Sequence, residues 1–185
     1  ILLKGCFFGN ESKMKIAKLA YGKFLMMLMA VFVLEACQTN EKMKTVNVTP
    51  VEHLDISRFM GTWFEIARYD HRFEKGMSDV RADYTLLPNG DIRVVNSGMK
   101  NGKRKEIIGK ARQKKGKRAG ELEVSFFLWF YSDYNILETD EEYNYAVIGG
   151  KFGKYLWILS RSPKIEEAVL DKLMTKIEKR GYDTT

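Results

Sequence analysis

The feature that most constrains the fold is a series of short β-strand signals that fills the chain from residue 61 to residue 161. Each segment is rich in aromatic or β-branched residues and is bounded by turn-forming or charged residues. The expected strands are Gly61–Tyr69, Val80–Leu86, Ile92–Met99, Lys105–Arg112, Leu122–Phe127, Tyr134–Glu138, Tyr145–Gly149 and Tyr155–Arg161. Nearly all connections are too short for a crossover helix, so the strands are expected to be antiparallel and up-and-down.

Two turns support this topology. Pro88-Asn89-Gly90 and Asn101-Gly102 are strong hairpin signals, because Asn and Gly accept the positive φ that tight hairpins need. Closure of eight strands into a barrel removes the unpaired edges of an open sheet. The sequence therefore predicts an all-β fold, an eight-stranded antiparallel up-and-down β-barrel.

A helix is expected after the last strand. Apolar residues recur there at helical spacing, at Ile165, Ala168, Val169, Leu173 and Ile177. Ser162 can cap this helix, Pro163 suits its first position, and Gly181 suits its end. We expect its apolar face to pack against the outside of the barrel.

The N-terminal segment has the pattern of an export signal. After Met14, the expected true start, three lysines precede an apolar run of 11 residues, Phe24–Leu34. That run is shorter than the about 20 residues that span a bilayer. Residues 1–36 are therefore interpreted as an upstream segment and signal peptide, with a buried core helix as the alternative.

The apolar run ends in Leu34-Glu35-Ala36-Cys37, which resembles a bacterial lipobox, although Glu35 departs from the usual residue. Cys37 would then carry acyl chains and become the mature N-terminus. The alternative is an ordinary secretory signal. Residues 37–49 are expected to be a lipidated tether and residues 50–185 the folded domain. Gln38 is not the Asp that retains enterobacterial lipoproteins in the inner membrane, so we expect a lipid anchor in the outer membrane, on its periplasmic face.

Composition narrows the function. The chain has a net charge of +7, and removal of residues 1–36 leaves about +4, which does not demand a nucleic-acid partner. Cys6 and Cys37 are the two cysteines, so the folded domain would have no thiol for a disulfide, a nucleophile or a metal. With His53 and His71 as the two histidines, we expect no metal site and no cofactor.

Three segments resemble the motifs of the lipocalin family. They are Gly61–Tyr69 (GTWFEIARY) with its continuation 70–76, Asp140–Ala146 (DEEYNYA) and Leu156–Arg161 (LWILSR). The resemblance covers residues 50–183. Within the family, the sequence is similar to bacterial lipocalins, plant temperature-induced lipocalins and apolipoprotein D. It implies a calyx that binds a fatty acid or lysophospholipid. Relatives continue beyond Gly181-Tyr182-Asp183 with a short strand, so we expect this chain to be less stable than a version that has it.

Within these motifs three residues are expected to be structural. Gly61 allows a tight bend, Trp63 plugs the barrel floor, and the resemblance implies that Arg161 lies across the Trp63 ring. Glu65 lies two residues after Trp63 and therefore points inward as well. It is interpreted as part of a hydrogen-bonded or ionic floor network, with a catalytic acid as the alternative.

Strand periodicity and the family register predict which side chains face the calyx. The expected ligand-binding residues are Ala67, Ala82, Tyr84, Val94, Asn96, Val124, Phe126, Tyr134, Ile136, Trp157 and Leu159. This mostly apolar set suits an acyl chain with a polar head. The alternative is that these side chains fill the interior completely.

Connectivity places four loops at the barrel mouth, 70–79, 100–104, 127–133 and 149–154. The loop Phe127–Tyr131 (FLWFY) is aromatic and would either meet a phospholipid surface or fold inward over a ligand. Mouth cations are expected at Arg72, Lys75, Lys100, Lys103, Arg104, Lys151 and Lys154. A second basic run, 110–118, belongs to the floor end, where we also expect the tether to emerge.

The leading interpretation is a non-enzymatic lipid carrier in the cell envelope, with a role in membrane maintenance or stress. Its expected partners are a lipid ligand and a membrane, with no nucleic acid, and a homodimer across the mouth is plausible. The main alternative is a lipid-modifying enzyme on the same scaffold, but no catalytic residue set is visible. Nucleic-acid binding would need aromatic residues on an open sheet face.

Overall fold

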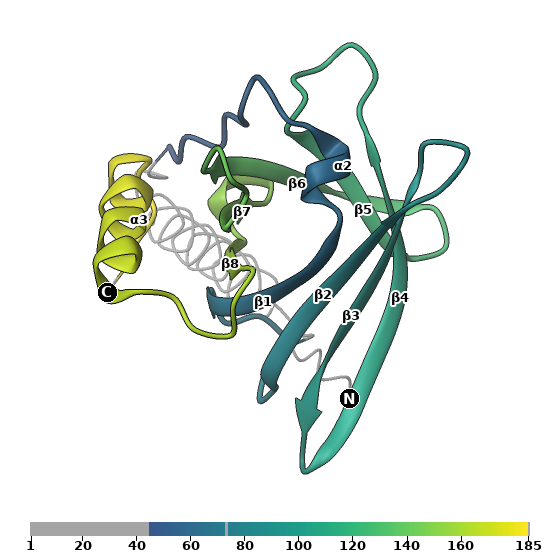
Figure 1. Cartoon of the computed structure of the whole chain (residues 1–185), viewed down its shortest axis with the longest axis horizontal. Coiled ribbons are helices and arrows are strands. Elements are labelled where there is room, and N and C mark those ends of the chain that lie inside the picture. The colour runs from purple at the N-terminus through teal and green to yellow at the C-terminus, as the bar shows by residue number, and fades with distance from the viewer. Residues whose placement is uncertain (1–44, 73, 185) are drawn as a thin grey trace, which may run out of the picture. The chain divides into compact units, whose positions relative to one another are not determined.

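The computed structural model describes residues 45–72 and 74–184, which form a closed antiparallel barrel (Figure 1). Each strand pairs with the next, and β8 returns to pair with β1. The strands are β1 (Gly61–Arg68), β2 (Ser78–Leu86), β3 (Ile92–Lys100), β4 (Lys103–Gln113), β5 (Glu121–Phe127), β6 (Phe130–Thr139), β7 (Tyr145–Gly149) and β8 (Leu156–Ser160). The predicted fold class and strand order are confirmed.

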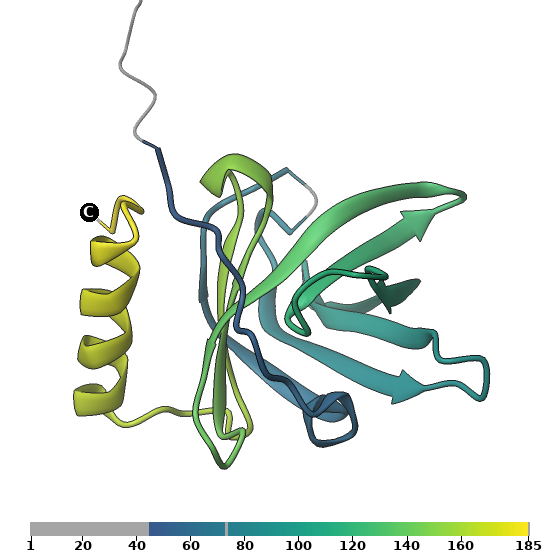
Figure 2. The ribbon, with the colours of Figure 1, turned by 90° about the horizontal axis from the view of Figure 1, so that it is seen from above.

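The barrel has two different ends. The short helix α2 (Ile56–Phe59) precedes β1 at the floor end, together with the β2–β3, β4–β5 and β6–β7 connections. The mouth end carries the β1–β2, β3–β4, β5–β6 and β7–β8 connections. In Figure 2 the floor end with α2 faces down and the mouth end faces up.

The β5–β6 connection differs from the expected loop. β6 already begins at Phe130, where it pairs with Phe127, so only Leu128 and Trp129 form the turn. The aromatic residues have high β propensity and extend the ladder of the hairpin instead of leaving it. The expected loop 127–133 is therefore the tip of a long hairpin.

The C-terminal helix starts later than the sequence suggests. α3 spans Glu167–Lys179, whereas Ser162 and Pro163 lie in a bend that leads from the barrel floor to its outer wall. The Ser160 hydroxyl accepts a hydrogen bond from the Ser162 amide, and Ser162 accepts one from the Lys164 amide, so these hydroxyls stabilise the bend rather than a helix start.

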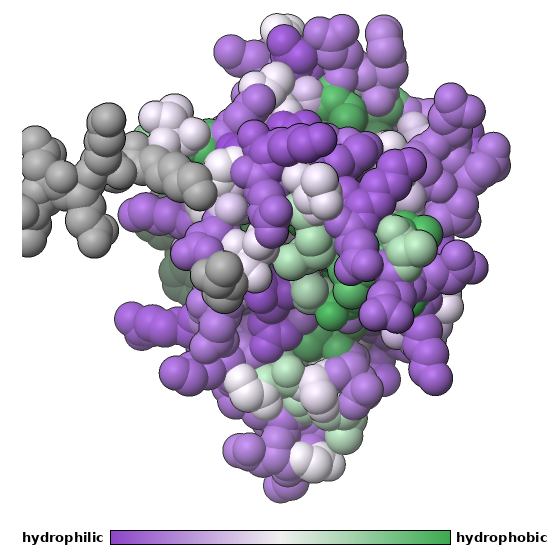
Figure 3. Space-filling model, turned by 90° about the vertical axis from the view of Figure 1, so that its left-hand side faces the viewer, coloured by the Kyte–Doolittle hydropathy of each residue, from purple (hydrophilic) through white to green (hydrophobic). Residues whose placement is uncertain are grey.

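The helix packs on the barrel wall as predicted. Leu173 and Ile177 are buried and form a second core with Leu137, Val147 and Ile158, separate from the core inside the barrel. The face of the molecule on this side is mainly hydrophilic, with apolar residues in small patches between the hydrophilic ones (Figure 3). An amphipathic helix that covers a sheet face produces this distribution.

The residues just before the barrel are packed rather than free. The Asn47 amide donates to the Arg180 carbonyl at 2.8 Å and the Val51 amide to the Ile136 carbonyl at 2.9 Å. Val46 contacts the second core and lies so close to Gly153, in the β7–β8 connection, that a Cβ there would be 2.7 Å from it. Residues 45–49, assigned to the tether from sequence, thus run along the barrel.

The described chain also begins at the mouth end, because Gly153 and the end of α3 lie there. The expectation that the tether emerges near the floor is corrected by this contact. Cys37 and the expected signal peptide lie outside the described residues. No helix within residues 45–72 and 74–184 is long and apolar enough to cross a membrane.

Candidate functional site: a cavity inside the barrel

An internal cavity of about 540 Å³ occupies the barrel, so side chains do not fill the interior completely. Its volume is within the usual range for sites that bind small molecules. Nine of the eleven residues predicted to face the calyx line it: Ala82, Tyr84, Val94, Asn96, Val124, Phe126, Tyr134, Trp157 and Leu159. The period-two alternation of the strands accounts for this agreement.

The two other predicted residues lie elsewhere. Ala67 is exposed, because a β-bulge between Glu65 and Ala67 shifts the register of β1 against β8. Arg68 then pairs across from Trp157 and takes the inward position. Ile136 is fully buried in the barrel core but does not line the cavity.

The walls of the cavity are mostly apolar with a few polar atoms. The hydroxyls of Tyr84 and Tyr134 are 2.7 Å apart, and burial raises the pKa of both above the ordinary value, so both remain protonated at neutral pH. The side-chain amide oxygen Oδ1 of Asn96 is buried and has no hydrogen-bond partner within the described residues. A ligand could therefore donate a hydrogen bond to it.

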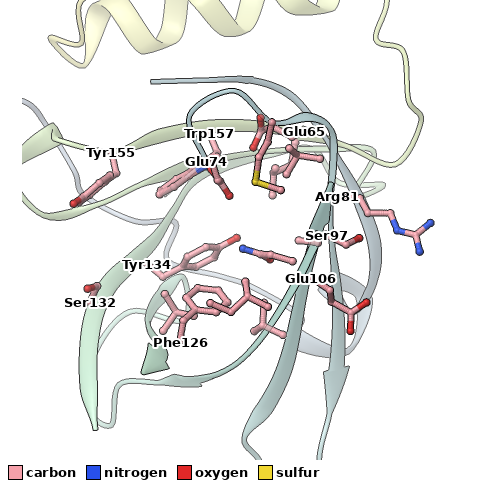
Figure 4. A pocket seen from close by; sticks show the side chains of 18 of the residues that line it. Glu65, Glu74, Arg81, Ser97, Glu106, Phe126, Ser132, Tyr134, Tyr155 and Trp157 are labelled. Carbon is pink, nitrogen blue, oxygen red and sulfur yellow. The ribbon is translucent and has the colours of Figure 1, made fainter. Parts of the chain in front are cut away.

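A cluster of charged side chains borders one side of the cavity (Figure 4). Arg68 forms an ion pair with Glu65 and donates to the backbone carbonyl of Glu74 at 3.0 Å. The Glu74 carboxylate accepts a hydrogen bond from the Trp157 indole at 3.1 Å and is 2.9 Å from the His71 imidazole. The cluster therefore ties the β1–β2 connection to the inner wall.

Burial controls the charges of this cluster. It raises the pKa of Glu65, against the opposing effect of the Arg68 hydrogen bond, and it lowers the pKa of His71. Both shifts favour the neutral forms, as expected for ionisable groups in a low-dielectric site.

Sequence reasoning missed Arg68, His71 and Glu74 as parts of this site. It assigned Glu65 to a network at the floor, whereas its partners come from the mouth end. Nothing in the strand pattern indicates the bulge that turns Arg68 inward. The i,i+3 spacing of Glu65 to Arg68 and of His71 to Glu74 is the only local signal.

The floor is closed by motif residues. The Arg161 guanidinium lies 3.9 Å from the centre of the Trp63 ring and donates to the carbonyls of Arg58, Met60 and Thr62 at 2.7–2.8 Å. Gly61 has a φ of +94°, and a Cβ there would be 3.4 Å from Arg161. This arrangement holds α2 against the barrel and leaves access to the cavity from the other end.

The cavity also opens between two strands. β4 pairs with β5 only from Lys110 to Gln113, so its mouth half diverges from the β5–β6 hairpin. Ile107 and Phe127 line this side of the cavity and are nevertheless 50% and 68% exposed. Arg81 and Glu106 are near the rim but point away from the cavity in Figure 4.

The lining of the cavity is suited to binding a small apolar molecule. Within residues 45–72 and 74–184, no group of three His, Cys, Asp or Glu side chains is placed to hold a metal ion. A closed eight-stranded barrel with a plugged floor and an apolar interior defines a class of calyx proteins that enclose one small molecule.

The comparisons identify the family within this class. Residues 54–185 match the family model described as a lipocalin-like domain, so the chain belongs to the lipocalin family. It is similar to the outer membrane lipoprotein Blc of Vibrio cholerae, at 43% identity over 75% of this chain and 82% of the relative. The Blc protein of Escherichia coli K12 is 38% identical over 84% of this chain and 88% of the relative.

A plant relative supports the family, and a solved structure supports the fold. Temperature-induced lipocalin-1 of Arabidopsis thaliana is 39% identical over 72% of this chain and 76% of its own. Insecticyanin from the tobacco hornworm Manduca sexta shares the fold, with a TM-score of 0.61 and 24% identity over 72% of this chain and 79% of that structure. The predicted family is confirmed. The predicted location also agrees with the bacterial relatives, which are named outer membrane lipoproteins.

Proposed function

We propose that this protein is an envelope-anchored lipocalin that binds a fatty acid or a (lyso)phospholipid in its barrel. The observation that carries the proposal is the apolar cavity of about 540 Å³ above a sealed floor. A membrane lipid held there would serve membrane maintenance or a stress response.

The lining explains why an acyl chain would enter. Val94, Val124, Phe126 and Leu159 offer apolar surface, and burial of methylene groups contributes about 25 cal/mol per Å². Most of the lining is apolar, and the carboxylates Glu65 and Glu74 lie to one side, near Trp157 (Figure 4). The acyl chain would therefore occupy the apolar part, with its head group toward the mouth.

We propose binding without catalysis. Glu65 and Glu74, the two carboxylates that line the cavity near Trp157, are both held by Arg68, and Glu74 is also held by the Trp157 indole. These contacts are those of a network that positions the β1–β2 connection. A general acid or base would instead be directed at a reacting group.

The cavity is tested by filling it. Val124→Trp should weaken binding of a fluorescent fatty acid by tenfold or more, because the indole occupies the space of the acyl chain. Overpacking costs about 1–3 kcal/mol only where space is already full, so the variant should keep near-normal stability. Trp157, which lines the cavity, should change its fluorescence when ligand enters the wild type.

Ile108→Trp is the matched control. Ile108 is an exposed neighbour of the cavity-lining Ile107 in β4 and points to the other face of the strand, so the same indole there adds bulk outside the barrel. It should bind like the wild type. Undiminished binding by Val124→Trp would contradict the proposed pocket, and severe destabilisation would mean that the cavity does not exist in solution.

We also propose that Cys37 is the lipid anchor, on the lipobox-like sequence and the bacterial relatives. Several acyl chains make membrane attachment durable, whereas one chain alone is marginal. Cys37→Ser should move the protein out of the membrane fraction while ligand binding is retained. A variant that stays tightly bound to membranes would show that Cys37 is not the principal anchor.

A further inference from the structure

The tip of the β5–β6 hairpin is an exposed apolar surface. Phe127, Leu128, Trp129 and Phe130 are each 63–72% exposed, so most of their apolar surface faces solvent, although Phe127 and Phe130 also border the cavity. Their rings stack on one another, Trp129 on Phe130 at 5.8 Å and Phe127 on Phe130 at 6.3 Å. A contiguous patch of this kind on a surface usually marks a site of contact with another molecule or a membrane.

The backbone conformation at the tip is unfavourable for the large residue Leu128. Leu128 has a φ of +51°, in the left-handed region where Gly or Asn is favoured and where a bulky side chain costs about 1–2 kcal/mol. The hairpin would close more easily with glycine at this position. A large apolar residue at an exposed and strained position therefore points to a role outside the folding of the chain.

The mouth loops are rich in cations that the domain itself does not neutralise. They carry seven cations, Arg72, Lys75, Lys100, Lys103, Arg104, Lys151 and Lys154. Within the described residues none of these has a carboxylate at ion-pair distance, and of the four carboxylates in the same loops Glu74 is buried and Asp133 pairs with Lys114. Phe152, in the β7–β8 connection, adds another exposed ring, with the Lys151 ammonium 4.9 Å from its centre.

The described chain enters the domain at this same end. Val46 contacts Gly153 of the β7–β8 connection, and only eight residues separate it from Cys37. A segment of that length spans at most about 30 Å. In Figure 2 the first described residues, the C-terminal end of α3 and the tip of the hairpin all lie toward the upper side.

We infer that the barrel docks mouth-first on a phospholipid bilayer, with the tip of the β5–β6 hairpin inserted among the lipids and the mouth cations on anionic head groups. The inference deepens the proposed lipid binding and rests on it. Aromatic and basic side chains together are the composition that favours the bilayer interface. Because Phe127 and Phe130 also line the cavity, its opening beside β4 faces the bilayer, and a lipid can enter without crossing water.

The test follows Trp129 in the full chain, reconstituted through its own anchor into vesicles of phosphatidylethanolamine and phosphatidylglycerol. The Trp129→Phe variant, measured in parallel, removes the contributions of Trp63 and Trp157. Lipids brominated on their acyl chains should quench Trp129 at least twofold, and aqueous iodide should quench it at least threefold less than in lipid-free protein. A Trp129 that stays accessible to iodide on vesicles overturns the inference.

If Trp129 is protected from iodide without vesicles, in a protein that runs as a dimer, a second copy covers the tip. That result would also overturn the inference.

Leu128→Gly tests the same contact without risk to folding, because glycine relieves the positive φ. It should raise or preserve the thermal midpoint while it lowers the docked fraction about tenfold, since a buried Leu contributes about one decade or more. Leu86→Ser, at an exposed apolar residue of the floor end, should leave docking unchanged.

The two proposals fail separately. Val124→Trp should dock like the wild type and lose ligand, whereas Leu128→Gly should bind a fatty acid presented as monomer and dock poorly. Docking without any lipid uptake would contradict the proposed function. Lipid uptake without docking would contradict this inference alone.

Discussion

The two ends of the barrel differ in how many of their aromatic and charged side chains have partners within the chain. At the floor, Trp63 is fully buried under Arg161, whose guanidinium also donates to four backbone carbonyls. Most floor cations are paired as well, with Lys110–Asp91, Arg112–Glu123, Lys114–Glu121 and Arg118–Glu52 contacts of 2.6–3.7 Å. At the mouth, the four apolar side chains of the hairpin tip and Phe152 are exposed, and none of the seven cations has an ion pair within the described residues.

This contrast separates residues that serve the fold from residues that serve a partner. A polar or aromatic group that is matched within the chain contributes to stability and says little about function. An exposed apolar group or an unpaired charge on the surface can contribute to the binding of another molecule. Substitutions at the two ends should accordingly change different properties of the protein.

The largest expected effect comes from paired tryptophan variants. Trp63→Ala should lower the free energy of unfolding by about 3–5 kcal/mol, because it opens a cavity in the floor and strips Arg161 of its ring contact. Trp129→Ala should change it by less than about 0.5 kcal/mol, as for most surface substitutions. Urea denaturation of both variants measures the difference, and similar losses would remove the distinction between the two ends.

A smaller effect is expected from surface charge. Lys103→Gln with Lys154→Gln should shift the docking equilibrium on anionic vesicles about fivefold per lysine, since each cation near such a surface contributes about 1 kcal/mol. Lys115→Gln with Lys117→Gln, cations of the floor end with no ion pair among the described residues, should have no effect. Emission of Trp129 at two salt concentrations reports docking, and an equal response of both pairs would contradict mouth-first orientation.

The smallest effect concerns pH. Burial lowers the pKa of His71 below its ordinary value of 6.5, so below pH 6.5 the unfolded chain binds more protons at this residue than the folded one. Stability should therefore fall as pH drops from 6.5 toward the lower folded pKa. His71→Gln should remove this part of the pH dependence, measured by urea denaturation at pH 7.5, 6.5 and 5.5.

His53→Gln, an exposed histidine near the floor, is the matched control and should follow the wild type. The raised pKa of Glu65 acts in the opposite sense, stabilising the fold as pH falls toward 4.5, and is common to all three proteins. If His71→Gln and the wild type lose stability in parallel, the His71–Glu74 contact does not titrate with folding.

Local pattern was enough to predict much of this protein. Period-two alternation identified the strands, and Asn101-Gly102 forms the tight turn expected of it, with φ of 52° and 70°. The same alternation placed residues such as Val124 and Trp157 at the cavity wall. These features depend on neighbours in sequence and on burial of one face of each strand, so the sequence alone determined them.

Tertiary structure decided the features that arise between distant segments. The bulge after Glu65 reverses the alternation, which exposes Ala67 and turns Arg68 toward Glu74. α3 starts at Glu167 rather than near Ser162, because the chain must first turn from the floor to the outer wall. Val46 lies at the mouth because it packs beside Gly153, over a hundred residues away. Register shifts and long-range packing are set by many weak contacts at once, and no short stretch of sequence contains them.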